Sequence, residues 1–111
     1  MAGKLTKITD ETFSAKVIGS RSPAVVDFWA TWCEPCHKLN EVLEQVAFEY
    51  DGRVSFFKVD VNESNAIASK YAVRSIPMLL FFNGGEIVDQ AVGALSRETL
   101  EEKLQKLLQY A

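Results

Sequence analysis

The fold is decided by the stretch Ala24-Val25-Val26-Asp27-Phe28-Trp29-Ala30-Thr31-Trp32-Cys33-Glu34-Pro35-Cys36. Its first seven residues form an almost continuous apolar run that is rich in β-branched and aromatic side chains. Such a run is typical of a strand buried on both faces, because helices cover both sides of its sheet. The stretch therefore predicts a helix-covered sheet with two cysteines directly after one of its strands.

An amphipathic helix follows the cysteines. Apolar residues recur at helical spacing from Leu39 to Tyr50, and Asp51-Gly52 ends the pattern. The opposite face is polar, which predicts that one side of the helix packs on the sheet and the other lies in water. The apolar set is Leu39, Val42, Leu43, Val46, Ala47 and Tyr50, and the polar set is Lys38, Glu41, Glu44, Gln45 and Glu49.

The rest of the chain supplies four more strands and three more helices. Thr9 is a candidate N-cap, with Asp10 and Glu11 near the positive end of its helix. Asn83-Gly84-Gly85 fits a hairpin turn, and Ser96 caps the last helix. The predicted strands are 5–8, 54–61, 78–82 and 86–92, and the predicted helices are 10–18, 64–71 and one after Ser96. The order β-α-β-α-β-α-β-β-α predicts an α/β fold with a central mixed sheet and helices on both faces.

The length and charge of the chain restrict its class. With 111 residues it has room for one hydrophobic core, so we expect a single domain over residues 1–111. Its 12 basic and 15 acidic residues give a formal net charge of −3, unlike the basic surface of a nucleic-acid-binding protein. No apolar run approaches the roughly 18 residues that span a bilayer, and residues 1–7 lack the apolar core of a secretory signal. We therefore expect a cytoplasmic protein with no nucleic-acid or membrane partner.

Cys33 and Cys36 are the only cysteines, and they share one short motif. A disulfide-stabilised secreted domain has more cysteines, spread along its chain. This pair therefore indicates a reactive site and not a structural disulfide. Two thiols at this spacing in the first turn of a helix can close a small disulfide ring. Unpaired N–H groups and partial positive charge at the helix start favour the thiolate of Cys33. Cys36 lies further into the helix, where we expect it to be more buried and to resolve a mixed disulfide.

Three segments carry a resemblance to the thioredoxin family. They are Val26 to Cys36, Ile76-Pro77 and Val92-Gly93-Ala94, and the similarity extends over essentially the whole chain. The resemblance implies the thioredoxin fold and a thiol–disulfide oxidoreductase that reduces protein disulfides through a reversible Cys33–Cys36 couple. It also implies a thioredoxin reductase that restores the dithiol, disulfide-containing proteins as substrates, and no bound cofactor. We expect a monomer.

The resemblance assigns roles to residues of this chain. Cys33 would be the exposed nucleophile, and Cys36 would be the resolving thiol. Pro77 would be a cis-proline that faces the disulfide and places Ile76 beside the extended backbone of a substrate. The implied substrate-binding surface consists of Trp32, Glu34, Pro35, Ile76, Pro77, Gly93 and Ala94.

Asp27 and Lys58 are charged residues inside otherwise apolar strands. Burial of a lone charge is costly, so each is expected to have a partner or a pKa suited to proton transfer. The resemblance implies that they are a buried acid and its partner, which help to move the proton of Cys36. The alternative, from the residues alone, places both side chains at an exposed edge of the sheet.

Glu34 and His37 depart from the common family motif, which has glycine and often lysine at these positions. A carboxylate beside Cys33 opposes thiolate formation, although it suits a helix N-terminus and has little effect if it points into water. His37 approaches Cys33 if the helix begins early, and its cationic ring would then offset Glu34. The alternative for His37 is a solvated position on the helix.

The cysteine motif also has rival interpretations. The run from Cys33 to His37 matches the C-x-x-C-H pattern of c-type haem attachment. The rest of the chain argues against haem, because Met78 is the only internal methionine that could serve as an axial ligand. A zinc site at this motif would lack a fourth ligand. Glu34-Pro35 between the cysteines also resembles the thioredoxin-like reductases of cytochrome maturation, which carry a membrane anchor and a central insertion. A last alternative is a binding module with incidental cysteines, which would keep its activity after Cys33→Ser.

Overall fold

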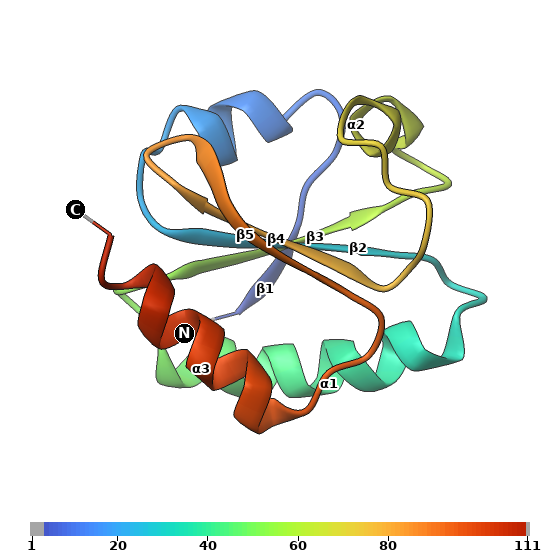
Figure 1. Cartoon of the computed structure of the whole chain (residues 1–111). Coiled ribbons are helices and arrows are strands. Elements are labelled where there is room, and N and C mark those ends of the chain that lie inside the picture. Colours follow the sequence, from blue (N-terminus) through green and yellow to red (C-terminus); the bar gives the residue numbers. More distant parts are fainter. Residues whose placement is uncertain (1–3, 111) are drawn as a thin grey trace.

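Five strands form one mixed sheet with helices on both of its faces (Figure 1). The computed structural model describes residues 4–110. Residues 1–3 and 111, which belong to the predicted domain, lie outside the described residues. The order of the elements confirms the predicted α/β architecture. The elements are β1 (Leu5–Lys7), η1 (Ser14–Ile18), β2 (Ala24–Trp29), α1 (Glu34–Glu49), β3 (Ser55–Asp60), α2 (Asn65–Lys70), β4 (Met78–Asn83), β5 (Glu86–Val92) and α3 (Arg97–Leu107).

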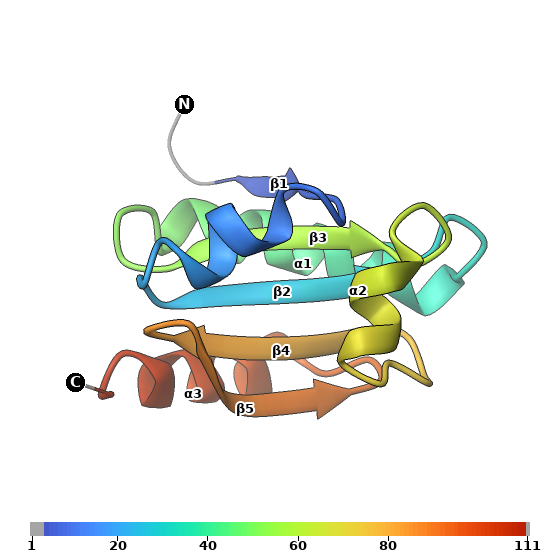
Figure 2. The same ribbon diagram turned by 90° about the horizontal axis from the view of Figure 1, so that it is seen from above.

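The strand β2 lies at the centre of the sheet, whose strand order is β1-β3-β2-β4-β5. It pairs in parallel with β3 and antiparallel with β4. The helices α1 and α3 cover one face of the sheet, and η1 and α2 cover the other (Figures 1 and 2). The central strand is therefore shielded from water on both sides, which explains its apolar sequence.

Two apolar cores lie on opposite sides of the sheet. The first joins α1 and α3 to the sheet and contains Val25, Leu43 and Leu104. The second joins η1 and α2 to the other face, where Val26 lies. Because successive side chains of a strand point to opposite faces, Asp27 lies on the same side of β2 as Val25, beneath α1.

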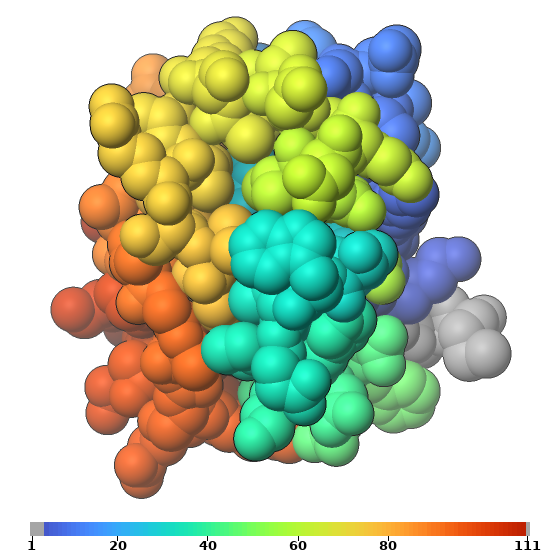
Figure 3. Space-filling view, turned by 90° about the vertical axis from the view of Figure 1, so that its right-hand side faces the viewer, coloured from blue at the N-terminus to red at the C-terminus, as the bar shows by residue number. Residues whose placement is uncertain are grey.

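The carboxyl end of β2 leads into the loop that begins α1. At this end of the molecule, the start of α1 (cyan in Figure 3) lies beside the segment between α2 and β4 (yellow) and the segment between β5 and α3 (orange). The topology thus brings together three segments that are far apart in the sequence. The two cysteines lie in the first of them.

The first predicted helix, 10–18, is wrong in its extent and in its cap. Residues 10–12 form a turn, and the helical structure that follows is a short π-helical segment, η1. The Thr9 carbonyl accepts hydrogen bonds from the backbone N–H groups of Thr12 and Phe13 at 3.1 and 2.9 Å. The main chain therefore closes this turn, and the Thr9 hydroxyl is not the cap that the sequence predicted.

Asp10 caps a different helix from the one predicted. Its carboxylate accepts hydrogen bonds from the backbone N–H groups of Ala66 and Ile67, at 3.3 and 2.9 Å, in the first turn of α2. Ser64, which precedes this helix, makes no side-chain cap of its own. The acidic side chain does lie at the positive end of a helix, but it reaches that helix across the fold.

The predicted hairpin and the predicted last cap are confirmed. Gly84 and Gly85 join β4 to β5 with φ values of +63° and +84°, a left-handed backbone that glycine adopts without a steric penalty. The Ser96 hydroxyl accepts a hydrogen bond from the Thr99 backbone N–H at 3.1 Å, which caps α3.

Candidate active site

Cys33 and Cys36 form a disulfide at the start of α1, with their Cα atoms 5.3 Å apart. Cys33 is the N-cap of the helix, and its Sγ accepts a hydrogen bond from the Cys36 backbone N–H at 3.3 Å. A thiolate at this position would receive the same N–H and the partial positive charge of the helix end. Cys33 is 6% exposed and Cys36 is fully buried, so the predicted nucleophile is less exposed than expected, although it is the more accessible of the two cysteines.

The loop before the disulfide is held by its own helix. The Cys33 backbone N–H donates to the Ala30 carbonyl at 3.2 Å, and the His37 ring Nε2 lies 2.7 Å from the Thr31 carbonyl. The His37 ring also packs edge-on against Trp29, with centroids 5.7 Å apart. The sequence allowed two positions for His37, near Cys33 or solvated on the helix. The exposed ring instead contacts the Thr31 carbonyl and Trp29. Its ring ties the loop to the first turn of α1.

Trp32 presents an apolar surface beside the disulfide. Its side chain is 71% exposed, although its indole N–H donates to the Asn62 side-chain oxygen at 3.0 Å. Glu34 and Pro35 follow in the first turn of α1, and both are exposed. An exposed tryptophan offers a large apolar contact surface to a partner. Because the hydrogen bond already fixes the Trp32 ring, the side chain loses little conformational entropy when a partner covers it.

The segment around Pro77, about forty residues later in the sequence, lies beside the disulfide. The Ile76–Pro77 peptide bond is cis, as predicted, and Ile76 packs against the cluster formed by Ala30 and the two cysteines. The Gly93 backbone N–H donates to the Pro77 carbonyl at 2.7 Å, which holds the residues after β5 beside this loop. Ala94 follows and is exposed. The segments that carry the predicted substrate-binding residues therefore meet at one end of the molecule, around the start of α1 (Figure 3).

Asp27 is a buried acid beneath the helix that carries the cysteines. Its side chain is fully buried on the central strand, and it lies opposite Lys58 in the parallel register of β2 and β3. Burial raises the pKa of Asp27 to about 8, against the opposing effect of the Lys58 charge. Neither strand is at the edge of the sheet, so the alternative of two exposed edge residues is wrong.

The Lys58 side chain is half-buried, and its ammonium group lies 5.0 Å from the centroid of the Trp29 ring. A cation over an aromatic face is stabilised by the ring quadrupole. This contact holds the positive charge close to the disulfide loop, because Trp29 also contacts the ring of His37.

Asn40 was missed by the sequence analysis. It is 8% exposed and is the one amide among the buried residues of α1. With its amide nitrogen turned toward the two acceptors, Asn40 donates to Asp27 Oδ2 and to the Cys36 carbonyl, the latter at 3.2 Å. The signal was a polar residue four positions after Cys36, on the face that the apolar pattern assigns to the core.

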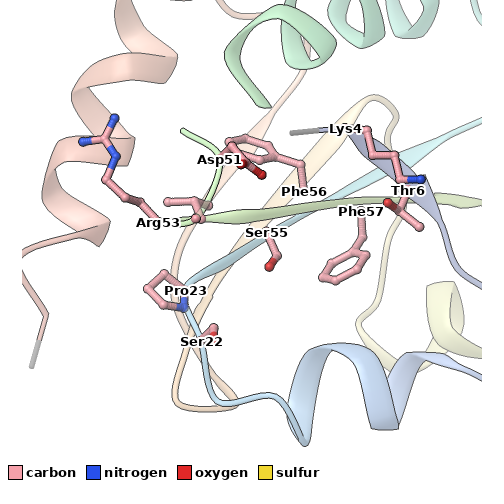
Figure 4. Close-up of a pocket in the computed structure, with 11 residues that line it drawn as sticks. Lys4, Thr6, Ser22, Pro23, Asp51, Arg53, Ser55, Phe56 and Phe57 are labelled. Atoms are coloured by element: carbon pink, nitrogen blue, oxygen red, sulfur yellow. The ribbon is translucent and has the colours of Figure 1, made fainter. Parts of the chain in front are cut away.

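Among residues 4–110, no helix has the length and hydropathy needed to span a bilayer, and no group of three His, Cys, Asp or Glu side chains is arranged to hold a metal ion. A pocket of about 410 Å³ opens at the far end of the sheet, where β2 and β3 begin (Figure 4). It is lined by residues that include Lys4, Ser22 and Arg53 and by no cysteine or histidine, so it has no part in thiol chemistry.

Comparison with known proteins gives matches along almost the whole chain. The family model described as Thioredoxin matches residues 4–106. Thioredoxin 1 of Nostoc sp. is 43% identical over 102 residues, which cover 92% of this chain and 95% of that protein. Thioredoxin C-2 of Corynebacterium nephridii is 46% identical over 100 residues, which cover 90% of this chain and 93% of that protein. The chloroplastic M-type thioredoxin of Pisum sativum is 42% identical over 101 residues, which cover 91% of this chain and 59% of that protein.

Proposed function

This chain belongs to the thioredoxin family and is a thiol–disulfide oxidoreductase with a Cys33–Cys36 redox couple, and from that premise we propose the roles of its residues. In the reduced protein, the Cys33 thiolate attacks one sulfur of a substrate disulfide. A bond forms between Cys33 and that sulfur, and the other substrate sulfur leaves as a thiolate that takes a proton from water. The N-cap position of Cys33 supports this role, because the first turn of α1 stabilises its thiolate.

Cys36 resolves the mixed disulfide. Its thiol loses a proton and its sulfur attacks Cys33 Sγ, which breaks the bond between Cys33 and the substrate and releases the second substrate thiolate. The substrate gains two electrons, and the protein is left with the disulfide observed here. Complete burial suits Cys36 for this step, since a buried thiol does not compete for substrates in solution.

Asp27 accepts the proton of Cys36 in this step. A general base works best when its pKa lies near the working pH, and burial raises the pKa of Asp27 to about 8. Lys58 supplies a positive charge across the strand pair that favours the ionised form of the acid. Both residues act on the proton and make no contact with the substrate.

Trp32, Ile76, Pro77, Gly93 and Ala94 bind the substrate. Ile76 offers its backbone to an extended segment of a disulfide-containing protein, as a strand pairs with a strand, while Trp32 covers apolar side chains. Pro77 holds the close approach of this segment to the disulfide, and Glu34 and Pro35 form the rim between the two cysteines. The exposed surface of Trp32 supports this assignment.

Membership of the thioredoxin family supports the partners that we propose. A thioredoxin reductase returns the Cys33–Cys36 disulfide to the dithiol, and proteins with accessible disulfides are the substrates. The protein acts as a monomer and as a single domain over residues 1–111, without a bound cofactor. A reducing compartment keeps such a couple in its dithiol form, and we propose the cytoplasm as its location.

The observation that supports these roles is the disulfide in which Cys33 caps α1 and Cys36 lies buried one turn later. Trapping of the mixed disulfide between the protein and a substrate tests these roles. Cys36→Ser should form a stable covalent complex with a disulfide-containing protein such as insulin, since the first attack occurs but the second cannot. Cys33→Ser should form none, because the remaining thiol is buried.

The two variants are matched controls for each other, since each removes one sulfur and prevents the intramolecular disulfide. Mass spectrometry of the non-reduced complex locates the bond on Cys33. If Cys33→Ser traps substrate as well as Cys36→Ser does, the assignment of nucleophile and resolving thiol is wrong.

A further inference from the structure

We propose that Asn40 is a positioning residue of the redox couple: its side-chain amide holds the Asp27 carboxylate on β2 against the Cys36 turn of α1 and stabilises the carboxylate in its ionised form. The proposal rests on the role of Asp27 proposed above. It concerns a residue that contacts neither a substrate nor the reacting sulfur atoms and acts only through Asp27.

The geometry places one amide between the Asp27 carboxylate and the backbone carbonyl of Cys36. An asparagine amide has two N–H donors, and here both have an acceptor: Asp27 Oδ2 and the Cys36 carbonyl, the latter at 3.2 Å. Asn40 lies four residues after Cys36 and so on the same face of α1. The amide therefore joins the strand that carries the acid to the helix turn that carries the resolving thiol.

The surroundings of Asp27 leave Asn40 as its hydrogen-bond donor. Across β3, Lys58 contributes a charge, but its ammonium group lies over the Trp29 ring. Across β4, the neighbour is the apolar Leu79. Asp27 Oδ1 has no hydrogen-bond partner among the described residues, and from α1 the side chain of Asn40 is the group that donates to Oδ2.

This arrangement matters in the resolving step. When Cys36 attacks, its thiol proton passes to Asp27, and the carboxylate becomes a neutral acid. Burial disfavours the ionised form of Asp27 before the transfer. A hydrogen bond from Asn40 to the ionised carboxylate is stronger than one to the neutral acid, so it offsets part of the cost of burial. Asn40 thus keeps the acid available as a base at a pH where burial alone would leave it protonated.

An apolar side chain is the expected occupant of this position. The other buried positions of α1 are filled by apolar residues or by Cys36, and a buried amide costs free energy unless its partners are present. Asn40 has two such partners, and the one that comes from the sheet is Asp27. The two polar residues therefore form one buried unit across the helix–sheet interface.

The test compares Asn40→Leu, which keeps the approximate size but has no donor, with Glu41→Gln, an exposed neighbour on the same helix. The pKa of Asp27 is followed by NMR of carboxyl-labelled aspartate in the oxidised protein. Loss of a hydrogen bond to a charged group should raise the Asp27 pKa by about one unit in Asn40→Leu, and Glu41→Gln should leave it unchanged. An unshifted Asp27 pKa in a folded Asn40→Leu overturns the proposal.

A kinetic arm separates positioning from a general loss of structure. At pH 7, Asn40→Leu should slow single-turnover resolution of a mixed disulfide about tenfold, the loss of ionised base that one pKa unit produces. In an Asp27→Asn background the same substitution should have no such effect. Equal slowing in both backgrounds would show that Asn40 serves packing alone.

Two safeguards keep these outcomes interpretable. Asn40→Ala is measured in parallel, and both variants are checked by thermal unfolding, so that an unfolded Asn40→Leu does not leave the question open. The Asp27 pKa needs no turnover, so its result stands even if the chain fails to reduce a disulfide. A failure of the proposed function is thereby distinguished from a failure of this inference.

Discussion

Asp27 on β2 lies directly opposite Lys58 on β3, yet the two side chains have different immediate neighbours. The Lys58 ammonium group lies over the Trp29 ring, whereas the Asp27 carboxylate meets the Asn40 amide beneath α1. The lysine charge lowers the pKa of Asp27 less than burial raises it, and the result is a pKa of about 8. An acid with such a pKa exchanges its proton near neutral pH, where a surface carboxylate stays ionised.

Asp27→Asn should make stability less dependent on pH. The folded protein keeps the Asp27 proton up to about pH 8, while its ordinary pKa of 3.8 applies to the unfolded chain. The stability contributed by this group is therefore fully present below about pH 4 and is lost as the pH rises to about 8, by at most about 1.4 kcal/mol per pH unit. Urea titrations from pH 5 to 8 should show wild type losing stability relative to Asp27→Asn.

The control for this prediction is Glu11→Gln, which removes an exposed carboxyl. Its stability should follow the pH dependence of the wild type. A difference between wild type and Asp27→Asn that stays constant from pH 5 to 8 would mean that the folded pKa of Asp27 is not raised.

The main elements of the fold were predictable because each carries its own pattern. The apolar run of β2 and the helical spacing of α1 record the burial of those segments directly. The prediction of a helix over 10–18 was wrong because the structure of this segment depends on distant groups: Asp10 caps α2, and Phe13, just before η1, and Val17 within it pack into the core. Such dependence leaves no local signal in the sequence.

The site was predictable to the same extent. The cysteines, Trp32 and Ile76-Pro77 are recognisable because their order along the chain forms a motif. Asn40 and the His37 contact were not, since each depends on what lies opposite in space. A helical pattern assigns a residue to the buried face, but it does not say that a buried acid will be its neighbour.

Asp10→Ala should destabilise the protein by about 1 kcal/mol, the usual cost of losing a helix N-cap. The carboxylate accepts hydrogen bonds from the Ala66 and Ile67 backbone N–H groups, which lack another cap because Ser64 supplies none. Urea unfolding at pH 7 measures the loss. Asp10→Asn should recover part of it, since an amide oxygen still accepts, and the neighbouring Glu11→Ala should change stability little. Equal effects at both positions would exclude the cap.

Glu34→Gln should raise the reduction potential slightly. The carboxylate lies in the first turn of α1 beside Cys33 and opposes its thiolate, so its removal stabilises the reduced form. Exposure weakens this effect to a few tenths of a kcal/mol, which corresponds to about 5–10 mV for a two-electron couple. Equilibration with a dithiol buffer, read from the fluorescence of Trp29 and Trp32, measures it. Glu41→Gln is the control, and a lower potential for Glu34→Gln contradicts the sign.

Trp32→Ala should separate protein substrates from small ones. The indole is 71% exposed beside the disulfide, so a docked protein covers it while a small disulfide does not. Tryptophan is enriched among the interface residues whose truncation costs more than about 1 kcal/mol, so kcat/KM for insulin reduction should fall about tenfold, mainly through KM. With a small aromatic disulfide it should change little. Phe48→Ala removes an aromatic side chain that is 62% exposed near the opposite end of α1, and it should leave both rates unchanged. Equal losses toward both substrates in Trp32→Ala would instead indicate that Trp32 acts on the thiol chemistry itself.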